Sequence, residues 1–509
     1  MTSPNKSELI AQNTLLLYVR MAVLMCVNIY TSRVVLNNLG VVDYGLYNVI
    51  GGVVGMLSIL SSSLSIAISR YLTFEIGRKN FDKLKRIFST SLVVQLSMAI
   101  IVISVAEIVG VWFLNTEMNI PLDRLSAANW ILQLSIISFA ISMLIVPFNA
   151  LIIAHENMAF FSYITVIEAM LKLLAAIIIG YVIFDALVTY GLFILIVSIC
   201  ILLIYAGICK SKFCECNFHF IFNRELLKDM MTFAGWNFIG STSGLMMLHG
   251  INILMNIFFG VKINTARGIA TQVDNAVNQF VYNFTLALNP QITKSYADKN
   301  FEYMYELVCR GAKYSFFLYF IFALPLFFEA PIILRLWLNM VPDYTVLFVR
   351  LSLINSLFAV LTLTMITSAL ATGDIKKYQI VVGGFALLDV PLCYIAFRMG
   401  FNPSSAYVIS IFINICLIYV RLLFIRSMIK MKIRMYLIEV IVPVSILSLF
   451  APIIPYLLHF YILDSFFRVF FVIVSCFIFS IVIIYYLGLN NTERNYVVNF
   501  VLQKIIRTK

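Results

Sequence analysis

The feature that most constrains this chain is a series of long apolar stretches separated by short polar connections. A bilayer core about 30 Å thick is crossed by about 20 apolar residues in a helix. Fourteen stretches of 19 to 27 residues reach that length. They lie at 13–36, 46–69, 88–114, 129–154, 162–184, 187–209, 233–259, 268–292, 315–334, 346–371, 379–397, 402–420, 437–459 and 469–488. The sequence therefore predicts a membrane protein with about fourteen transmembrane helices.

The composition supports an all-α membrane fold. Hydrophobic residues make up 62% of the 509 residues and charged residues 12%, whereas soluble domains are about 25% charged. Lipid offers the backbone no hydrogen-bond partner, so only helices or closed barrels cross it. Barrel strands would appear as alternating segments of about 10 residues, a pattern that this chain lacks.

The basic residues predict the orientation of the spans. With the N-terminus in the cytoplasm, the inner segments carry 26 Lys and Arg residues and the outer loops carry six. Such an excess marks the cytoplasmic side. We therefore expect a multi-pass membrane protein with both termini in the cytoplasm. The net charge of +12 is mainly a topology signal, so nucleic acid is not an expected partner.

The chain contains an internal duplication at an offset of 220 residues. Lys79-Asn80-Phe81-Asp82 aligns with Lys299-Asn300-Phe301-Glu302, and Glu107 before Trp112 resembles Glu329 before Trp337. Because the repeated unit has an even number of spans, the two copies run parallel. Transporters built in this way place their site between the halves and alternate access. The predicted parts are an N-terminal lobe (1–209), a cytoplasmic linker (210–232), a C-terminal lobe (233–430) and two appended helices with a tail (431–509).

Polar residues concentrate on the two spans that open the second half. At 100° per residue, one face of span 268–292 collects Thr271, Gln272, Asn275, Asn278, Gln279, Tyr282 and Asn289. Arg267 and Asp274 flank this stripe, and Asn252 lies on the polar arc of the preceding span. A water-filled cavity and hydrogen bonding between helices are both open readings of the pattern.

Charged residues inside spans supply further candidates. Arg20 lies about 10 Å from the inner boundary at 1.5 Å per residue, where a charge usually faces a cavity or a partner. Glu168 and Lys172 have the i, i+4 spacing of an ion pair on one helix. Lys172 also aligns with Asp389 at an offset of 217, so a bridge between the halves is an alternative. Asp274 is the best candidate for a proton carrier, unless it pairs with Arg267.

Several short motifs resemble bacterial polysaccharide-biosynthesis flippases of the multidrug/oligosaccharidyl-lipid/polysaccharide exporter superfamily. These motifs are Asn13-Thr14-Leu15, Tyr30-Thr31-Ser32-Arg33, Leu39-Gly40, Asp43-Tyr44-Gly45-Leu46-Tyr47-Asn48, Arg70-Tyr71-Leu72-Thr73-Phe74-Glu75, Asn264-Thr265-Ala266-Arg267-Gly268-Ile269-Ala270 and Asn289-Pro290-Gln291-Ile292. The resemblance covers nearly the whole chain.

The resemblance implies two pseudo-symmetric six-helix lobes around a central cavity. It implies an O-antigen or similar oligosaccharide on undecaprenyl pyrophosphate as cargo, moved from the inner to the outer leaflet for lipopolysaccharide or other surface polysaccharide. Arg20 and Arg267 stand where this pattern has cavity arginines, and the helices from 437 fit a groove for the lipid tail. The expected partners are the lipid-linked oligosaccharide, membrane lipids and polysaccharide-assembly proteins.

Two other functions compete with this reading. A multidrug or cation antiporter of the same superfamily needs a buried carboxylate in the first half, but span 13–36 carries Arg20 and Arg33 and no acid. A membrane polymerase or ligase needs catalytic groups on large outer loops, and the longest loop, 115–128, has 14 residues. We expect no enzyme and no cofactor. Cys214, Cys216 and His219 are three candidate zinc ligands without a fourth, so no metal site is expected.

Overall fold

The apolar stretches of the sequence form helices. A computed structural model of the protein describes residues 6–56, 58–116, 120, 122–216, 224–337, 341–462, 466–490 and 492–495. Across these ranges every regular element is helical and no strand occurs, which confirms the predicted all-α class.

Eleven helical segments in the described ranges are long and apolar enough to span a bilayer. They are Gln12–Gly40, Phe81–Thr116, Leu125–Ala154, Met158–Tyr181, Ala186–Lys212, Phe301–Trp337, Thr345–Thr372, Lys376–Arg398, Ser405–Ile429, Ile433–Tyr461 and Phe467–Gly488. The other three predicted spans, 46–69, 233–259 and 268–292, lie in helices but do not reach this criterion. Within the described ranges apolar length therefore supports eleven spans, and the predicted number of fourteen is not confirmed.

The chain divides into two compact units. Unit 1 comprises Met1–Ile239 with Thr293–Lys299, and unit 2 comprises Gly240–Ile292 with Asn300–Lys509. The α-helices of unit 1 are α1 (Lys6–Met56), α2 (Ser58–Gly77), α3 (Phe81–Val105), α4 (Val111–Thr116), α5 (Leu125–Ala154), α6 (Met158–Ile178), α7 (Ala186–Lys212) and the start of α8 (Arg224–Ala297). Short turns η1 (Ala106–Gly110), η2 (Leu122–Arg124), η3 (Ile179–Tyr181) and η4 (Cys214–Cys216) complete it.

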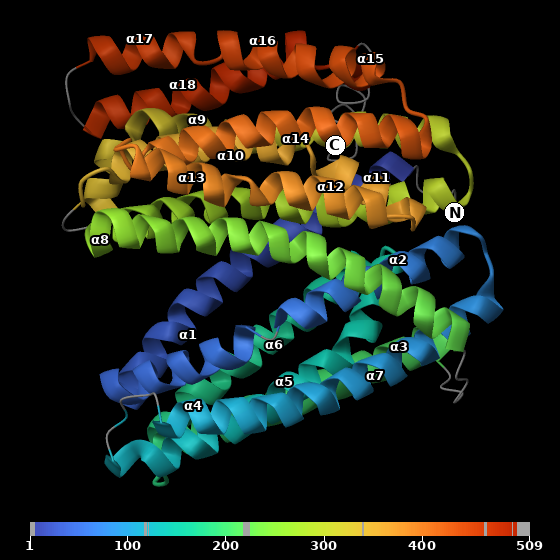
Figure 1. Ribbon diagram of the computed structural model, residues 1–509, viewed down its shortest axis with the longest axis vertical. Coiled ribbons are helices and arrows are strands. Elements are labelled where there is room, and N and C mark those ends of the chain that lie inside the picture. The colour runs from blue at the N-terminus through green and yellow to red at the C-terminus, as the bar shows by residue number, and fades with distance from the viewer. Residues whose placement is uncertain are drawn as a thin grey trace, which may run out of the picture. The chain divides into compact units, whose positions relative to one another are not determined.

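Helix α5 lies at the centre of unit 1. It packs against α7, α3, α2 and α1 (Figure 1). Its residues Ala128, Ile131 and Leu132 are almost completely buried, in a cluster that also contains Val35 of α1 and Leu187 of α7. Burial of a large aliphatic side chain contributes about 1.5–3 kcal/mol, so this cluster is a main source of stability for the unit.

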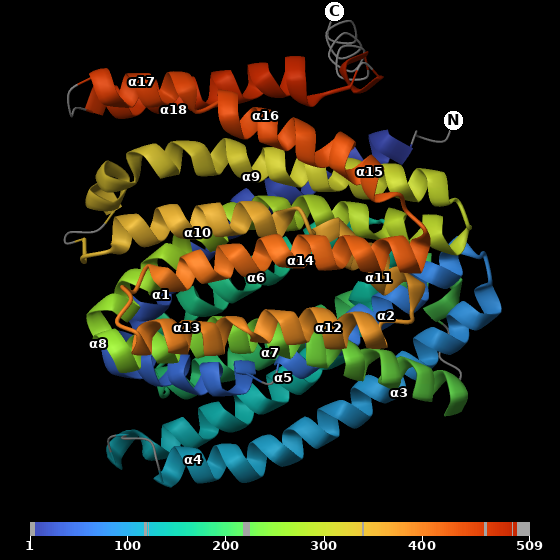
Figure 2. The same ribbon diagram turned by 45° about the horizontal axis from the view of Figure 1, so that its top comes forward.

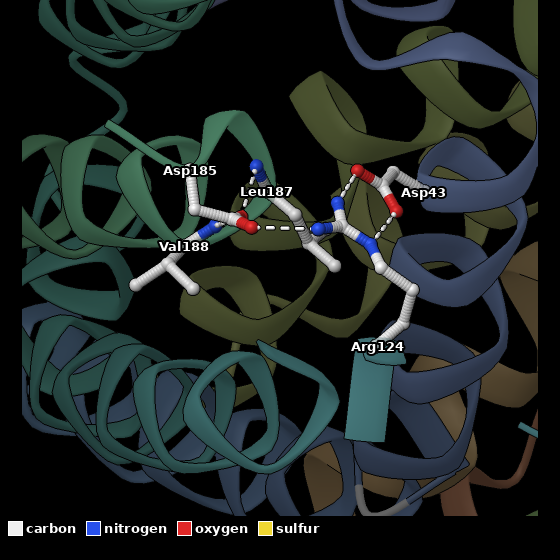
Figure 3. Close-up of polar contacts among 5 residues, drawn as sticks. All are labelled: Asp43, Arg124, Asp185, Leu187 and Val188. Atoms are coloured by element: carbon white, nitrogen blue, oxygen red, sulfur yellow. Dashed lines mark hydrogen bonds and ion pairs between the residues drawn. The ribbon is translucent and has the colours of Figure 1, made fainter. Parts of the chain in front are cut away.

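An ionic clasp joins three segments at one end of unit 1. Arg124 donates through Nε to Asp43 Oδ1 at 2.8 Å and through Nη1 to Asp185 Oδ2 at 2.7 Å (Figure 3). Asp185 Oδ1 accepts from the backbone N–H groups of Leu187 and Val188 at 3.0 and 3.1 Å. Asp185 thus caps the N-terminus of α7 while its other oxygen binds the guanidinium.

Helix α1 contains two helical parts that meet within the connection predicted between the first two spans. Its only described non-helical residue is Gly40, with φ 75° and ψ 173°. Without a Cβ, glycine adopts this conformation at little steric cost. Gly40 therefore bends α1 three residues before Asp43.

Unit 2 contains the middle of α8, Gly240–Ile292, and ten further α-helices in the described ranges. They are α9 (Phe301–Trp337), α10 (Thr345–Val360), α11 (Leu363–Thr372), α12 (Lys376–Leu387), α13 (Asp389–Arg398), α14 (Ser405–Ile429), α15 (Ile433–Tyr436), α16 (Val442–Phe450), α17 (Ile453–Tyr461) and α18 (Phe466–Ile483). The π-helical turn η5 (Leu437–Ile441) precedes α16, and the π-helical turn η6 (Ile484–Gly488) follows α18. Helix α10 packs against both α9 and α14.

Helix α8 turns back on itself within unit 2. Arg267 Nε donates to Asn252 Oδ1 at 2.5 Å, although 15 residues of straight helix measure about 22 Å. The chain must therefore reverse direction between these residues. The seventh and eighth predicted spans are consequently two arms of α8 rather than helices joined by a polar loop.

The C-terminal helices are attached to α9 by charges as well as by packing. Helices α17 and α18 run side by side, and both contact α9 (Figure 2). Glu329 of α9 is completely buried and contacts His459 Nδ1 at 2.8 Å and Arg468 Nη2 at 3.3 Å. Lys313 of α9, also buried, donates to Glu493 at 2.7 and 2.9 Å.

Candidate functional site

A polar cavity of about 300 Å³ lies among α8, α10 and α14 of unit 2. We call it the Arg267 cavity. Its lining residues are Gly244, Ile251, Arg267, Thr271, Asp274, Asn275, Ser352, Asn355, Tyr407 and Ser410. Spans with so many polar groups turned inward are typical of ligand or ion pathways.

Arg267 is held in place by groups from its own helix and from α14. Its side chain is 6% exposed. Nε donates to Asn252, and the guanidinium carbon lies 5.5 Å from the ring centroid of Tyr407. The amide and the aromatic face together compensate a cation that would be costly alone in the membrane.

Asp274 receives hydrogen bonds from two hydroxyl groups. Tyr319 OH donates to Oδ1 at 2.5 Å, and Ser356 Oγ donates to Oδ2 at 3.0 Å. Asn278 lies within 3.5 Å of the same Ser356 Oγ. Both hydroxyl groups donate to carboxyl oxygens, which accept hydrogen bonds whether the group is ionised or protonated, so these contacts fix the position of Asp274 and leave its charge free to change.

A second carboxylate lies behind the wall of the cavity. Asp389 is completely buried on α13 and accepts from Ser410 Oγ at 2.7 Å. Cys393 Sγ lies 3.5 Å from its other oxygen, and Asp389 interacts electrostatically with Arg267. The site thus combines one guanidinium with two carboxylates, each of which has its own amide or hydroxyl partner.

The structure places the predicted site residues in several positions. Arg267, Asp274 and Asn275 line the cavity. Asn252 accepts from Arg267, and Asn278 donates to Ser356. Asp389 lies behind Ser410. Gln279 and Tyr282 are exposed and do not line this cavity.

The remaining predicted residues belong to unit 1. Arg20 of α1 is 8% exposed, with its guanidinium carbon 4.6 Å from the ring centroid of Phe161 on α6. Lys172 donates to Glu168 Oε1 at 2.6 Å, the i, i+4 pair on one helix. Both members of that pair are partly exposed.

Sequence reasoning did not find the residues that α9, α10 and α14 contribute. These are Tyr319, Ser352, Asn355, Ser356, Tyr407, Ser410 and Asn414. The i, i+3, i+4 spacing of Ser352, Asn355 and Ser356 and the i, i+3, i+7 spacing on α14 are polar stripes at helical period. Applying the periodicity test to these two spans would have found them.

The metal-like sequence cluster receives no support from the described residues, which contain no group of three or more His, Cys, Asp or Glu arranged for a metal ion. His219 and the side chain of Cys214 lie outside the described residues. Glu215, which lies between the two cysteines, has its Oε1 2.7 Å from His155 Nε2. Burial alone would raise the pKa of the Glu215 carboxyl, but the hydrogen bond with His155 lowers that pKa below its ordinary value.

No family model and no curated protein matches the sequence, whereas solved structures match the fold. One is an outward-facing multidrug resistance MATE family transporter of the MOP superfamily, with a TM-score of 0.73, 13% identity, and 84% of this chain and 96% of that chain covered. The chain has the fold of the MATE transporters.

Two further structures with the MATE fold are similar to the same extent. The MATE transporter ClbM in complex with Rb⁺ has a TM-score of 0.70 at 13% identity, covering 85% of this chain and 96% of that one. A MOP superfamily transporter from Pyrococcus furiosus has a TM-score of 0.71 at 13% identity, covering 84% and 96%. Its description gives a reverse polarity of the binding pocket.

Proposed function

We propose that this protein is a membrane exporter that works by alternating access and uses the Arg267 cavity to bind cargo or a coupling ion. The observation that supports this function is a charged, polar cavity enclosed by membrane helices of MATE-like fold. Charges at this depth are retained mainly for function. Such transport involves no covalent chemistry, so the protein is proposed not to be an enzyme.

The first cargo that we propose is an oligosaccharide linked to undecaprenyl pyrophosphate. Arg267 would bind the pyrophosphate, because a guanidinium offers both charge and a fixed fork of donors to phosphate oxygens. Arg20 is proposed as a second cationic contact, and Asn275, Asn278, Gln279 and Tyr282 as contacts for the sugar. In this function the protein acts in a bacterial inner membrane, beside the proteins that assemble surface polysaccharide.

The second cargo class is organic cations, and the structural evidence favours it at least as strongly. Asp274 lines the cavity and Asp389 lies directly behind it, so the carboxylates outnumber the guanidinium. A similar structure is described as a multidrug resistance transporter. In this function Asp274 would alternate between binding cargo and binding a proton or a cation.

The two cargo classes make opposite demands on the same two residues. In proteoliposomes loaded with a lipid-linked oligosaccharide, Arg267→Gln should reduce transport at least about tenfold, the cost of one charge-assisted hydrogen bond, while Arg267→Lys should retain part of it. With a cationic dye, Asp274→Asn should abolish transport and Arg267→Gln should spare it.

The matched control is Arg398→Gln, which removes an exposed arginine at the end of α13. It should leave both activities unchanged. Loss with the lipid cargo alone supports the flippase, and loss with the dye alone supports the antiporter. If Arg20→Ala and Arg267→Ala both left lipid-linked transport intact at normal protein levels, the assignment of those arginines would be wrong.

A further inference from the structure

A second and larger cavity lies where α9 ends and α10 begins. Its volume is about 920 Å³. We call it the α9–α10 cavity. It is lined by Pro331, Arg335, Val341, Pro342, Asp343, Tyr344, Thr345, Val346, Leu347 and Arg350. It shares no lining residue with the Arg267 cavity, so its role is a separate question from the cargo site.

The N-terminus of α10 leaves donors open toward this cavity. The N–H of Thr345 donates to Pro342 O at 3.2 Å, and that of Phe348 donates to Tyr344 O at 2.8 Å. The N–H groups of Val346 and Leu347 donate to no described atom, and the residue before the helix, Tyr344, supplies no side-chain cap. Open amides at a helix N-terminus form a binding site for anions.

The side chain of Thr345 is a second, independent indication of a ligand. Thr345 is completely buried, and its Oγ1 has no hydrogen-bond partner among the described atoms. A buried hydroxyl without a partner costs about 1–3 kcal/mol. Because Thr345 lines the cavity, a ligand oxygen there would satisfy this group.

Two arginines give the cavity a positive charge. Arg350 is positioned by bonds from Nε to Phe327 O at 2.9 Å and from Nη2 to Phe328 O at 3.4 Å. Arg335 is exposed and makes no ion pair with a described residue. Asp343, also exposed, is the single carboxylate in the lining, so the positive groups outnumber it.

The position of the cavity indicates which anion reaches it. It lies at the adjoining ends of the apolar segments Phe301–Trp337 and Thr345–Thr372, and Trp337, 52% exposed, lies beside it in sequence. Tryptophan is typical of the level of lipid headgroups. Guanidinium groups and helix amides at this level match phosphate oxygens.

We propose that the α9–α10 cavity binds a phosphate-bearing headgroup. Arg335 and Arg350 contact the phosphate, and Thr345 and the first amides of α10 complete its coordination. The ligand is a membrane phospholipid or a soluble pyrophosphate. Binding here does not depend on which cargo the protein exports.

The test measures binding rather than transport. Purified protein is mixed with phosphatidylglycerol or phosphatidylcholine in detergent, and retained lipid is counted by native mass spectrometry. Radiolabelled inorganic pyrophosphate is titrated in parallel and as a competitor. We expect retention of phosphatidylglycerol over phosphatidylcholine, binding of pyrophosphate, or both. Displacement of phosphatidylglycerol by pyrophosphate would place both at one site.

The variants separate this cavity from general surface charge. Arg335→Gln combined with Arg350→Gln should weaken anion binding at least about tenfold. Thr345→Val should weaken it several-fold, and Asp343→Asn should tighten it. The control Arg398→Gln removes an exposed arginine outside the cavity and should change nothing.

Two results would overturn the proposal. One is unchanged anion binding in all three cavity variants; the other is an equal loss in the Arg398→Gln control. If the double arginine variant does not fold, Thr345→Val and Asp343→Asn decide alone, because they predict changes in opposite directions.

Discussion

At the level of single residues, the ion pair between Lys313 and Glu493 fixes the segment after the last span to α9. Lys313 is 2% exposed and Glu493 is 6% exposed. Arg310 Nε lies 3.4 Å from the same carboxylate, and the Asn490 N–H donates to it at 2.8 Å. Burial alone would raise the pKa of Glu493, but the hydrogen bonds from Lys313 and Asn490 lower it below its ordinary value.

We predict that Glu493→Gln destabilises the protein at neutral pH by about 3 kcal/mol, because a buried lysine then lacks its counter-charge. A carboxyl with a lowered pKa stabilises the folded state above its unfolded pKa, and this contribution is lost as the pH falls through the folded value. The difference in unfolding free energy between wild type and variant should therefore be largest near pH 7 and should shrink below about pH 4.5. Thermal unfolding in detergent measures it.

The matched control for this prediction is Glu306→Gln. Glu306 pairs with Arg310 at 2.6 Å, but both side chains are more than a third exposed. Such pairs contribute less than about 1 kcal/mol, so the control should unfold close to wild type at every pH. A Glu493→Gln variant as stable as this control at pH 7 would contradict the assigned role.

The charged members of the Arg267 cavity could be predicted from the sequence, but most of their partners could not. Arg267, Asp274 and Asn275 lie on one helix, where a period of 3.6 residues brings them together. Tyr319 and Ser356, which bind Asp274, belong to other helices. Helix periodicity shows which face of a helix is polar, but not which neighbouring helix faces it.

At the level of elements, the bend of α1 at Gly40 uses a backbone conformation that glycine adopts without strain and other residues do not. Its φ of 75° and ψ of 173° lie in a region that is essentially restricted to glycine. A Cβ built there meets no atom within 4 Å. We predict that Gly40→Ala destabilises the protein by about 1–3 kcal/mol through backbone strain alone.

Gly207 is the appropriate control because its surroundings are equally open. It lies within α7, and a Cβ there also meets no atom within 4 Å. Gly207→Ala should stabilise the protein by about 0.5–1 kcal/mol, since alanine favours helix. Both variants are compared by the temperature at which the buried thiols of Cys209, Cys309 and Cys476 become reactive. Equal shifts for both variants would show that position 40 does not require glycine.

The two copies of the internal duplication share the geometry of one turn. Lys79 and Lys299, 220 residues apart, have φ values of 56° and 59°. The next residue in each copy, Asn80 or Asn300, accepts a bond from the backbone N–H three residues later, at 3.1 and 3.3 Å. Because an Asn cap acts locally, the same side chain at the same position gives the same turn in both copies.

The bends of α1 and α8 fall between predicted spans, as the sequence indicates, but the backbone on either side of each bend is more helical than a loop. Polar residues near 37–45 and 260–267 indicate the end of a span, but they do not exclude helix. The contact between Arg267 and Asn252 is a tertiary one. A pattern of hydropathy records the depth of a residue in the membrane better than its backbone conformation.

At the level of the whole molecule, the duplication does not include the helices after residue 430, yet buried charges tie them to the preceding helix. Glu329 depends on His459 and Arg468, and Lys313 depends on Glu493. The buried hydroxyl of Tyr436 also donates to Leu361 O at 2.7 Å. The sequence marks these helices as an appendage, but two buried charges of α9, Lys313 and Glu329, pair with residues of the C-terminal segment.

We therefore predict that a chain ending at Lys430 is unstable because two charges lose their partners. Each uncompensated buried charge costs about 3–5 kcal/mol, which approaches the total stability of many proteins. In the truncated chain, Glu329→Gln with Lys313→Met should raise the yield of folded protein. In the full chain the same pair of substitutions should lower stability, since His459 and Arg468 then lose the charge of Glu329 and Glu493 loses Lys313.

This reversal of sign between the two chain lengths is the decisive measurement, and it is read by size-exclusion profile and thermal unfolding of the four proteins. A general loss of packing would make the double variant equally harmful or neutral in both lengths. A truncated chain that is as stable as the full chain with Glu329 and Lys313 intact would show that these charges reach water or lipid headgroups once the appended helices are gone.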